Sequence, residues 1–277
     1  MVLMSSFFDE SEAGPYFTAG GYLFRKSKVR PFEKEWGLML KKAEIPYFRM
    51  SACNAGEYPF KDMNWGERDT IAREAIRLIC KYATYGHYVA VMPQEFAAVL
   101  GKESFVDNPY TLCLYICLMA MRDWSNRNDP NALIGYFFEA GSNHQGDAGR
   151  FVSAIGLTER GPDFRYAGHE FVLKERSMPT QAADMLAWHS SKNLNRFDAG
   201  LTHPRGDFRA LLDGVETGYT YANESLLREF AYITHKHAGS DLHLAKAAFR
   251  DDMHSFKKDP EALMRLLERQ GAITRNG

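Results

Sequence analysis

Cysteine is scarce in this chain: only four occur among its 277 residues. They are Cys53, Cys80, Cys113 and Cys117, and none of them forms a C-x-x-C pair. This spacing fits neither a disulfide framework nor a zinc site. We therefore expect a protein of the reducing cytoplasm.

Long apolar runs are also missing. The most apolar stretch extends from Thr111 to Met121, whereas a membrane-spanning helix needs about 20 such residues. The beginning of the sequence has no basic segment followed by a long apolar one, so we expect no signal peptide. No membrane partner is expected.

Neither sign of charge dominates, because the formal net charge is only -1. The chain as a whole thus has no electrostatic reason to bind nucleic acid or an acidic membrane surface. Several catalytic motifs are absent too: no glycine-rich phosphate loop, no G-x-S-x-G elbow and no H-E-x-x-H is found. These absences argue against nucleotide hydrolases, esterases and zinc proteases.

The most informative feature that is present stands at the start of the chain. Residues 3–8 are short and mostly apolar, Asp9 and Glu10 follow at once, and residues 16–24 read as a second strand after a turn. The pattern predicts a hairpin with carboxylates at the end of a buried strand. Burying a carboxylate is costly unless a cation or hydrogen-bond donors compensate it.

Two later acids stand in similarly apolar surroundings. Glu139 ends the run Tyr-Phe-Phe, and Asp184 lies in a helical stretch among small and apolar residues, 181–187. Hard cations such as Mg²⁺ and Mn²⁺ prefer oxygen ligands, and a pair of such ions can cleave a phosphodiester. Asp9, Glu139 and Asp184 therefore predict a divalent-metal site. Taken singly, each acid also fits a plain role as a turn cap or a solvated surface residue.

One histidine is close enough in sequence to take part. His144 follows Glu139 within one predicted loop, where it would reach a substrate phosphate or donate a proton. The alternative is an inert histidine of a surface loop.

The hydrophobic periodicity predicts alternating helices and strands followed by a helical part. Helices are expected at residues 31–45, 67–82, 109–124, 150–155, 179–194, 223–237, 241–256 and 260–270. Strands are expected at residues 3–8, 16–24, 45–50, 86–92, 133–139 and 164–173. Residues 51–64 and 200–218 read as loops. We predict an α/β core over 1–195, with a mixed sheet because of the early hairpin, and a helical C-terminal extension over 196–277.

Three motifs resemble a known family. Phe-Phe-Asp-Glu-Ser at 7–11, Phe-Thr-Ala-Gly-Gly-Tyr at 17–22 and Gln-Ala-Ala-Asp-Met-Leu-Ala at 181–187 look like the domain-of-unknown-function 3800 family of bacterial and phage proteins. The similarity covers about residues 4–195. It implies a ribonuclease H-like fold in which Asp9, Glu139 and Asp184 bind Mg²⁺. Many family members have glycine directly after Asp-Glu-Ser, whereas Glu12 follows here.

These observations lead to a metal-dependent nuclease as the first hypothesis. Asp9, Glu139 and Asp184 would hold Mg²⁺ or Mn²⁺ and Glu10 would assist them, with His144 near the reacting groups and nucleic acid as the partner. The alternative is a non-catalytic module on a degenerate nuclease fold, which binds protein or nucleic acid in mobile-element biology or phage defence. A glycosidase with paired carboxylates is a third possibility. The sequence leaves the oligomeric state open.

Overall fold

The computed structural model describes residues 3–100, 106, 108–141, 145–157 and 164–236. A six-stranded sheet forms its centre, with the strand order β5-β4-β1-β2-β3-β6. The strands are β1 (Leu3–Ala13), β2 (Tyr16–Arg25), β3 (Tyr85–Val91), β4 (Leu133–Glu139), β5 (Tyr166–Val172) and β6 (Thr217–Ala222). In this sheet β2 runs antiparallel to β1 and β3, while β4, β5 and β6 pair in parallel with their neighbours. The predicted mixed sheet is thus confirmed.

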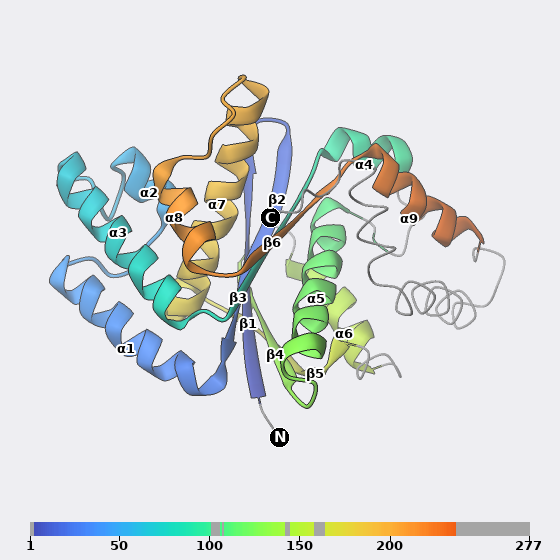
Figure 1. The fold of residues 1–277 in the computed structure, drawn as a ribbon, viewed down its shortest axis with the longest axis horizontal. Coiled ribbons are helices and arrows are strands. Elements are labelled where there is room, and N and C mark those ends of the chain that lie inside the picture. The colour runs from blue at the N-terminus through green and yellow to red at the C-terminus, as the bar shows by residue number, and fades with distance from the viewer. Residues whose placement is uncertain (1–2, 101–105, 107, 142–144, 158–163, 237–277) are drawn as a thin grey trace.

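Helices cover both faces of the sheet (Figure 1). On one face lie α1 (Lys26–Lys42), α2 (Met50–Ala55), α3 (Trp65–Tyr82), α7 (Met178–Asp198) and α8 (Gly206–Gly214). On the other face lie α4 (Pro93–Val99), α5 (Pro109–Asn128), α6 (Gln145–Leu157) and α9 (Glu224–Lys236). A 3-10 turn, η2 (Lys174–Arg176), leads from β5 into α7.

The alternation along β1 supplies both cores. Phe8 packs with the α5 side and Phe7 with the α7 side, because successive strand side chains point to opposite faces of a sheet. The two aromatic residues stack on neighbours from β4: Phe7 on Phe137 at 4.7 Å and Phe8 on Phe138 at 5.5 Å between ring centroids. This pairing fixes the register of β1 against β4, and therefore fixes which residues follow on each face.

The close approach of α7 to the sheet depends on a small residue. Gly20 of β2 pairs with Asp9 of β1, and a Cβ at Gly20 would lie 3.4 Å from Leu186 Cγ of α7 and 3.1 Å from Tyr88 Cβ. A larger side chain at this position would push α7 outward. The glycine thus keeps the middle of α7 next to Asp9.

Three expectations about the elements are wrong. Residues 45–50 form no strand, and α2 falls in the segment 51–64 that we read as a loop. The predicted loop 200–218 contains α8 and the start of β6. Because β6 pairs with β3, the part after residue 196 is not purely helical as expected. The helices predicted at 241–256 and 260–270 lie outside the described residues.

Candidate metal centre

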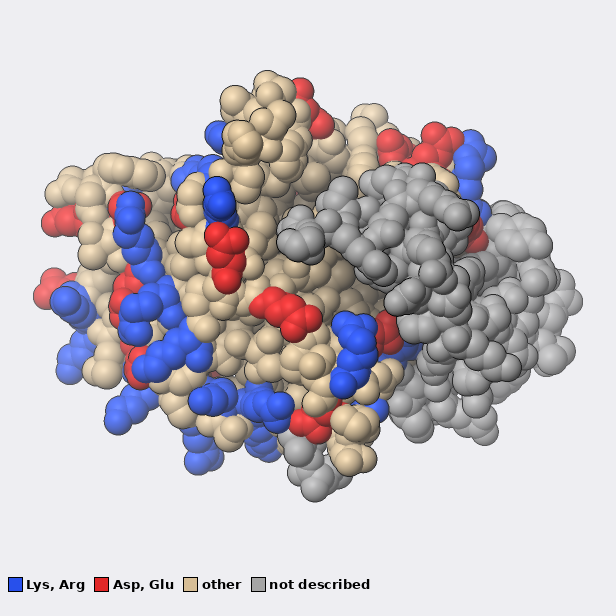
Figure 2. Space-filling model, in the orientation of Figure 1, with Lys and Arg blue, Asp and Glu red and all other residues tan. Residues whose placement is uncertain are grey.

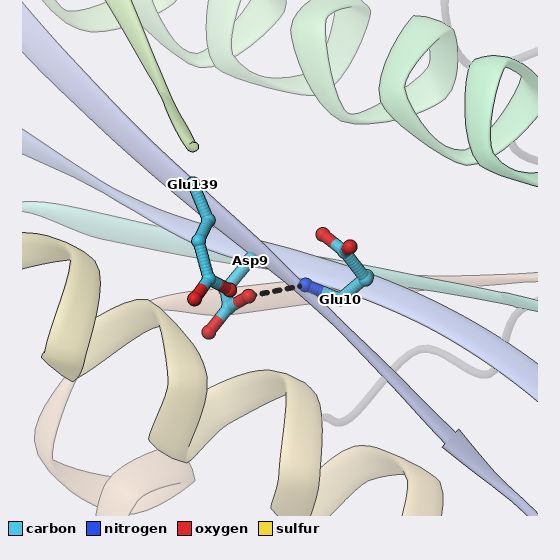
Figure 3. Close-up of side chains that lie close together, drawn as sticks. All are labelled: Asp9, Glu10 and Glu139. Atoms are coloured by element: carbon cyan, nitrogen blue, oxygen red, sulfur yellow. Dashed lines mark hydrogen bonds between the residues drawn. The ribbon is translucent and has the colours of Figure 1, made fainter. Parts of the chain in front are cut away.

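Asp9 and Glu139 meet on one face of the sheet. Asp9 has the parity of Phe7 on β1, and Glu139 has the parity of Phe137 on β4, so both side chains leave the sheet toward α7. Phe8 pairs with Phe138, which places the two acids next to each other on adjacent parallel strands. Glu139 ends β4, but β1 continues to Ala13, so the expectation that Asp9 follows the end of its strand is wrong. Figure 3 shows their carboxyl groups side by side. Asp9 is 1% exposed.

Asp184 reaches the same place from α7. Its Oδ2 accepts a hydrogen bond of 2.6 Å from the backbone N–H of Met50, and its Oδ1 lies 2.9 Å from Lys174 Nζ. The residue is buried. The segment before α2 and the lysine of η2 therefore hold both of its oxygens.

Lys174 joins the three acids. Its Nζ lies 2.7 Å from Asp9 Oδ2, 3.0 Å from Glu139 Oε2 and 2.9 Å from Asp184 Oδ1. The lysine is only 6% exposed, and burial alone would lower its pKa. The attraction of the three carboxylates outweighs burial and raises the pKa of Lys174 above its ordinary value. A positive charge is therefore stabilised at the point where β1, β4 and α7 meet.

One lysine does not neutralise three carboxylates, and the two neighbouring acids respond differently. Burial, which opposes ionisation, raises the pKa of Asp9 well above its ordinary value despite the attraction of Lys174. Burial also disfavours ionisation of Glu139, but the hydrogen bond with Asp9 and the charge of Lys174 lower its pKa overall. Of the two, Asp9 is therefore the acid that the fold makes harder to ionise.

Glu10 leaves β1 on the other face of the sheet, toward α5. Burial first, and the charge of Glu10 next, raise the pKa of Tyr110 on α5. The backbone N–H of Glu10 donates to Asp9 Oδ1 at 2.8 Å (Figure 3). Nevertheless, one oxygen each from Asp9, Glu10 and Glu139 lie within 4.8 Å of one another. These three could share one ion, whereas Asp184 is not part of this group and is joined to the acids through Lys174.

A glutamine one turn before Asp184 braces the site. Gln181 Oε1 accepts from Trp36 Nε1 at 2.8 Å and from the N–H of Phe48 at 2.9 Å, and its Nε2 donates to the carbonyl of Lys174 at 2.9 Å. A single fully buried side chain thus connects α1, the segment before α2 and η2. The Gln-x-x-Asp motif accordingly contains one residue that binds backbone and one that faces the acids.

The structure brings Asp9, Glu10, Glu139 and Asp184 together, whereas His144 lies outside the described residues. Sequence reasoning did not find Lys174. Its signal was a lysine directly after an apolar strand, Tyr166–Val172, and ten residues before Asp184. Lysine is common at the end of a strand, so its sequence position alone does not indicate a site residue. It does so only once the positions of the neighbouring acids are known.

Comparison with protein-family models and with curated proteins gives no match. The resemblance to the domain-of-unknown-function 3800 family therefore stays a prediction. Over the described ranges, no helix is both long and apolar enough to cross a membrane.

Proposed function

We propose that this chain hydrolyses phosphodiester bonds in nucleic acid with the help of Mg²⁺ or Mn²⁺. The observation that carries the proposal is the convergence of Asp9, Glu139 and Asp184, from two strands and a helix, within 3.0 Å of one buried cationic atom. Groups so arranged already stabilise positive charge. Carboxylate oxygens are also the ligands that Mg²⁺ and Mn²⁺ prefer.

The donor set fits a hard divalent ion. Asp9, Glu10 and Glu139 would hold it, since one oxygen of each already lies within 4.8 Å of the others. In the proposal Asp184, which shares Lys174 with Asp9 and Glu139, would be a further ligand. Asp9 Oδ2 is buried and accepts no hydrogen bond within the described residues; Lys174 Nζ is its close partner. Such an ion, when bound, lowers the pKa of a water ligand and offsets the charge of the reacting phosphate.

The chain's own residues have separable tasks in this proposal. Asp9 is the carboxyl group whose raised pKa makes its ionisation the harder one, and a bound cation would favour its ionised form. Asp184 is held in place by the N–H of Met50. Lys174 keeps the acids together in the metal-free protein. Its Nζ would leave its position between the three carboxylates if an ion were bound there.

The topology supports the ribonuclease H-like part of the proposal. That fold is expected to carry its acids on the first strand, a middle strand and a late helix, and the three acids here lie on β1, β4 and α7. The central strands follow the order β5-β4-β1-β2-β3, with β2 antiparallel to the others. β6 then adds a sixth strand beside β3.

Lys174 also favours a second candidate function, a non-catalytic module. A lysine that pairs with three acids makes a structural ion cluster in which no metal is needed. In that case the chain would bind a partner without hydrolysing it. The two candidates differ in whether a metal ion displaces the lysine.

Incubation of single-stranded, duplex and hybrid nucleic acids with Mg²⁺ or Mn²⁺ tests the proposal, with calorimetry for metal binding. We expect metal-dependent cleavage that Asp9→Asn lowers by at least about 100-fold, because the amide removes a ligand at the centre of the site. Asp213→Asn is the matched control, since its side chain is 72% exposed on α8, and it should cleave as the wild type does. If the wild type neither cleaves nucleic acid nor binds metal, the hydrolase proposal is contradicted and the non-catalytic module is favoured.

A further inference from the structure

The segment between α1 and α2 lies in extended form against the start of α7. The N–H of Phe48 donates to Gln181 at 2.9 Å, and the N–H of Met50 donates to Asp184 at 2.6 Å. Arg49 between them has φ -139° and ψ 123°. In an extended chain, N–H groups two residues apart point the same way. Two residues of α7 therefore hold the backbone of Arg49 in position from both sides.

This geometry decides which side chains face solvent. Phe48 is fully buried and Met50 is 3% exposed, so Tyr47 and Arg49 lie on the opposite side of the extended segment. Arg49 is exposed. Within the part of the chain that the structure describes, its guanidinium forms no hydrogen bond and no ion pair. The unpaired cation stands one residue from the N–H that binds Asp184.

Arg49 is close enough to the acids for its charge to act on them. Burial disfavours ionisation of Glu139, while Asp9, Lys174 and then Arg49 lower its pKa. An arginine next to a cluster of carboxylates would be expected to pair with one of them. Here its place on a firmly anchored backbone keeps it at the rim of the site, with its hydrogen-bond donors available to another anion.

Two tyrosines continue the same surface. Tyr47 shares the solvent side of the segment with Arg49, and its ring meets that of Tyr58 edge to face, with 6.4 Å between centroids. Tyr58 is 64% exposed. Surface tyrosines of this kind offer a flat face on which a nucleic-acid base stacks, and such stacking is tolerant of sequence.

We propose that residues 47–58 form the substrate-binding rim of the metal centre, where Arg49 binds a backbone phosphate and Tyr58, supported by Tyr47, stacks with a base of single-stranded nucleic acid. The inference rests on the proposed function, because it names the substrate of that same site. A single strand is required since the faces of paired bases in a duplex are covered by their neighbours.

On the face that Figure 2 shows, Lys and Arg are mixed with Asp and Glu over the left side of the molecule, and Lys and Arg prevail along its lower left edge. Several of the charged side chains are joined in ion pairs, such as Arg73 with Asp69 and Lys81 with Glu35. With a net charge of -1, binding must rely on a few local contacts. Arg49, whose charge acts on Glu139, and the two tyrosines of the same surface provide such contacts.

Fluorescence anisotropy with short labelled oligonucleotides tests the inference without requiring turnover. Single-stranded DNA, single-stranded RNA and duplex are compared in Ca²⁺ and in chelator. We expect Arg49→Ala to weaken single-strand binding about 10-fold and to lower the slope of log affinity against log salt by about 0.7, as for one lost phosphate contact. Arg49→Lys should fall between, because it keeps the charge but loses the planar donors.

Tyr58 and a remote arginine complete the design. Tyr58→Ala should weaken single-strand binding by about 10-fold, while Tyr58→Phe keeps the ring and binds within about twofold of the wild type. Arg73→Ala is the matched control, since Arg73 is an exposed arginine of α3 paired with Asp69. It should bind as the wild type does. The DNA and RNA arms identify which single strand is preferred.

The outcomes separate this inference from the proposed hydrolysis. The proposed substrate-binding rim would be contradicted if the wild type bound no oligonucleotide or if the Arg49 and Tyr58 variants bound like the wild type. An equal loss of affinity in Arg73→Ala would also contradict it. Tight binding of duplex with the same affinity in the wild type and in Tyr58→Ala would contradict the preference for single strands. Binding that depends on Arg49 and Tyr58, with no cleavage under any metal, would support the rim and contradict hydrolysis. Cleavage that depends on Asp9 but not on Arg49 would do the reverse.

Discussion

Lys174 is the residue on which the acids of the metal-free protein depend. It is buried, and each of its three close partners is a carboxylate. Repulsion among Asp9, Glu139 and Asp184 alone would predict that removing one acid relieves strain. The lysine offsets part of this repulsion, so that removing it leaves buried carboxylates without their cation.

Lys174→Met should therefore destabilise the metal-free protein by about 3–5 kcal/mol, because it leaves the carboxylates without a cation. Mn²⁺ should restore much of the loss, since an ion that binds only the folded state adds stability by mass action. Urea unfolding of wild type and variant, each with chelator and with millimolar Mn²⁺, measures both effects.

The control for this change is Lys192→Met, which removes an exposed lysine of α7. It should alter the free energy of unfolding little in either condition. If Mn²⁺ stabilises Lys174→Met no more than it stabilises the wild type, then the lysine and the ion do not compete for one point.

Among the elements, the ones with clear periodicity were predictable. β4 was expected at 133–139 and is found at Leu133–Glu139, because a strand with a turn before it and an acid after it leaves little choice of boundary. α3 begins two residues before its expected start, and α5 begins at the expected residue. Asn64 and Asn108 cap these helices by accepting from the N–H three residues on, a local signal that the sequence carries by itself.

The segment 45–50 shows why other elements were not predictable. Its alternating apolar residues are typical of a strand, and its backbone is extended at Arg49. Its N–H groups, however, donate to the side chains of Gln181 and Asp184 and not to another strand. Partners more than 130 residues away decide this. The candidate acids were predictable from their apolar surroundings, while Lys174 and Arg49 acquire meaning only from such distant contacts.

Gln181 is the side chain that holds this segment, and its replacement tests the arrangement. Gln181→Leu leaves Trp36 Nε1, the N–H of Phe48 and the carbonyl of Lys174 without their partner. We expect a loss of about 3 kcal/mol in the free energy of unfolding, because buried polar groups without partners are costly. Hydrogen exchange at Phe48 and Met50 should accelerate together.

Gln181→Glu is the informative comparison. It keeps the acceptor for Trp36 and Phe48 but sets a carboxylate against the carbonyl of Lys174. The exchange rates at Phe48 and Met50 should then stay near those of the wild type although stability falls. Equal acceleration in both variants would show that the segment is not held through this acceptor.

For the whole molecule, the mixed sheet followed from the early hairpin and six strands were expected, but one of the six is another segment than predicted. β6 was missed because Thr217–Ala222 is short and only partly buried, so its sequence resembles a loop. Its parallel pairing with β3 also places α8 on the face that carries α7. α8 contributes Asp207 and Phe208, which enclose a histidine of α7.

That histidine links stability to pH. His189 is 1% exposed, its ring stacks on Phe208 at 5.7 Å, and neither ring nitrogen has a hydrogen-bond partner within the described part of the chain. Its Nδ1 lies 3.9 Å from Asp207 Oδ1, and Arg205 binds that same carboxylate. Burial lowers the pKa of His189 to about 4, although the charge of Asp207 opposes this.

The unfolded chain takes up a proton at His189 near pH 6.5, whereas the folded chain does so only near pH 4. Between these values the unfolded state binds more protons, so stability should fall as the pH is lowered through this window and change no further below it. The full effect would be about 3 kcal/mol. Other groups of the protein also titrate, so the useful quantity is the difference between wild type and His189→Leu. Urea unfolding of both proteins from pH 8 to about pH 4 should show the wild type losing stability relative to the variant as pH falls. A difference that stays constant over this range would mean that the fold does not shift the pKa of His189. A wild type that gains stability relative to the variant as the pH falls would mean that Asp207 stabilises the charged imidazole.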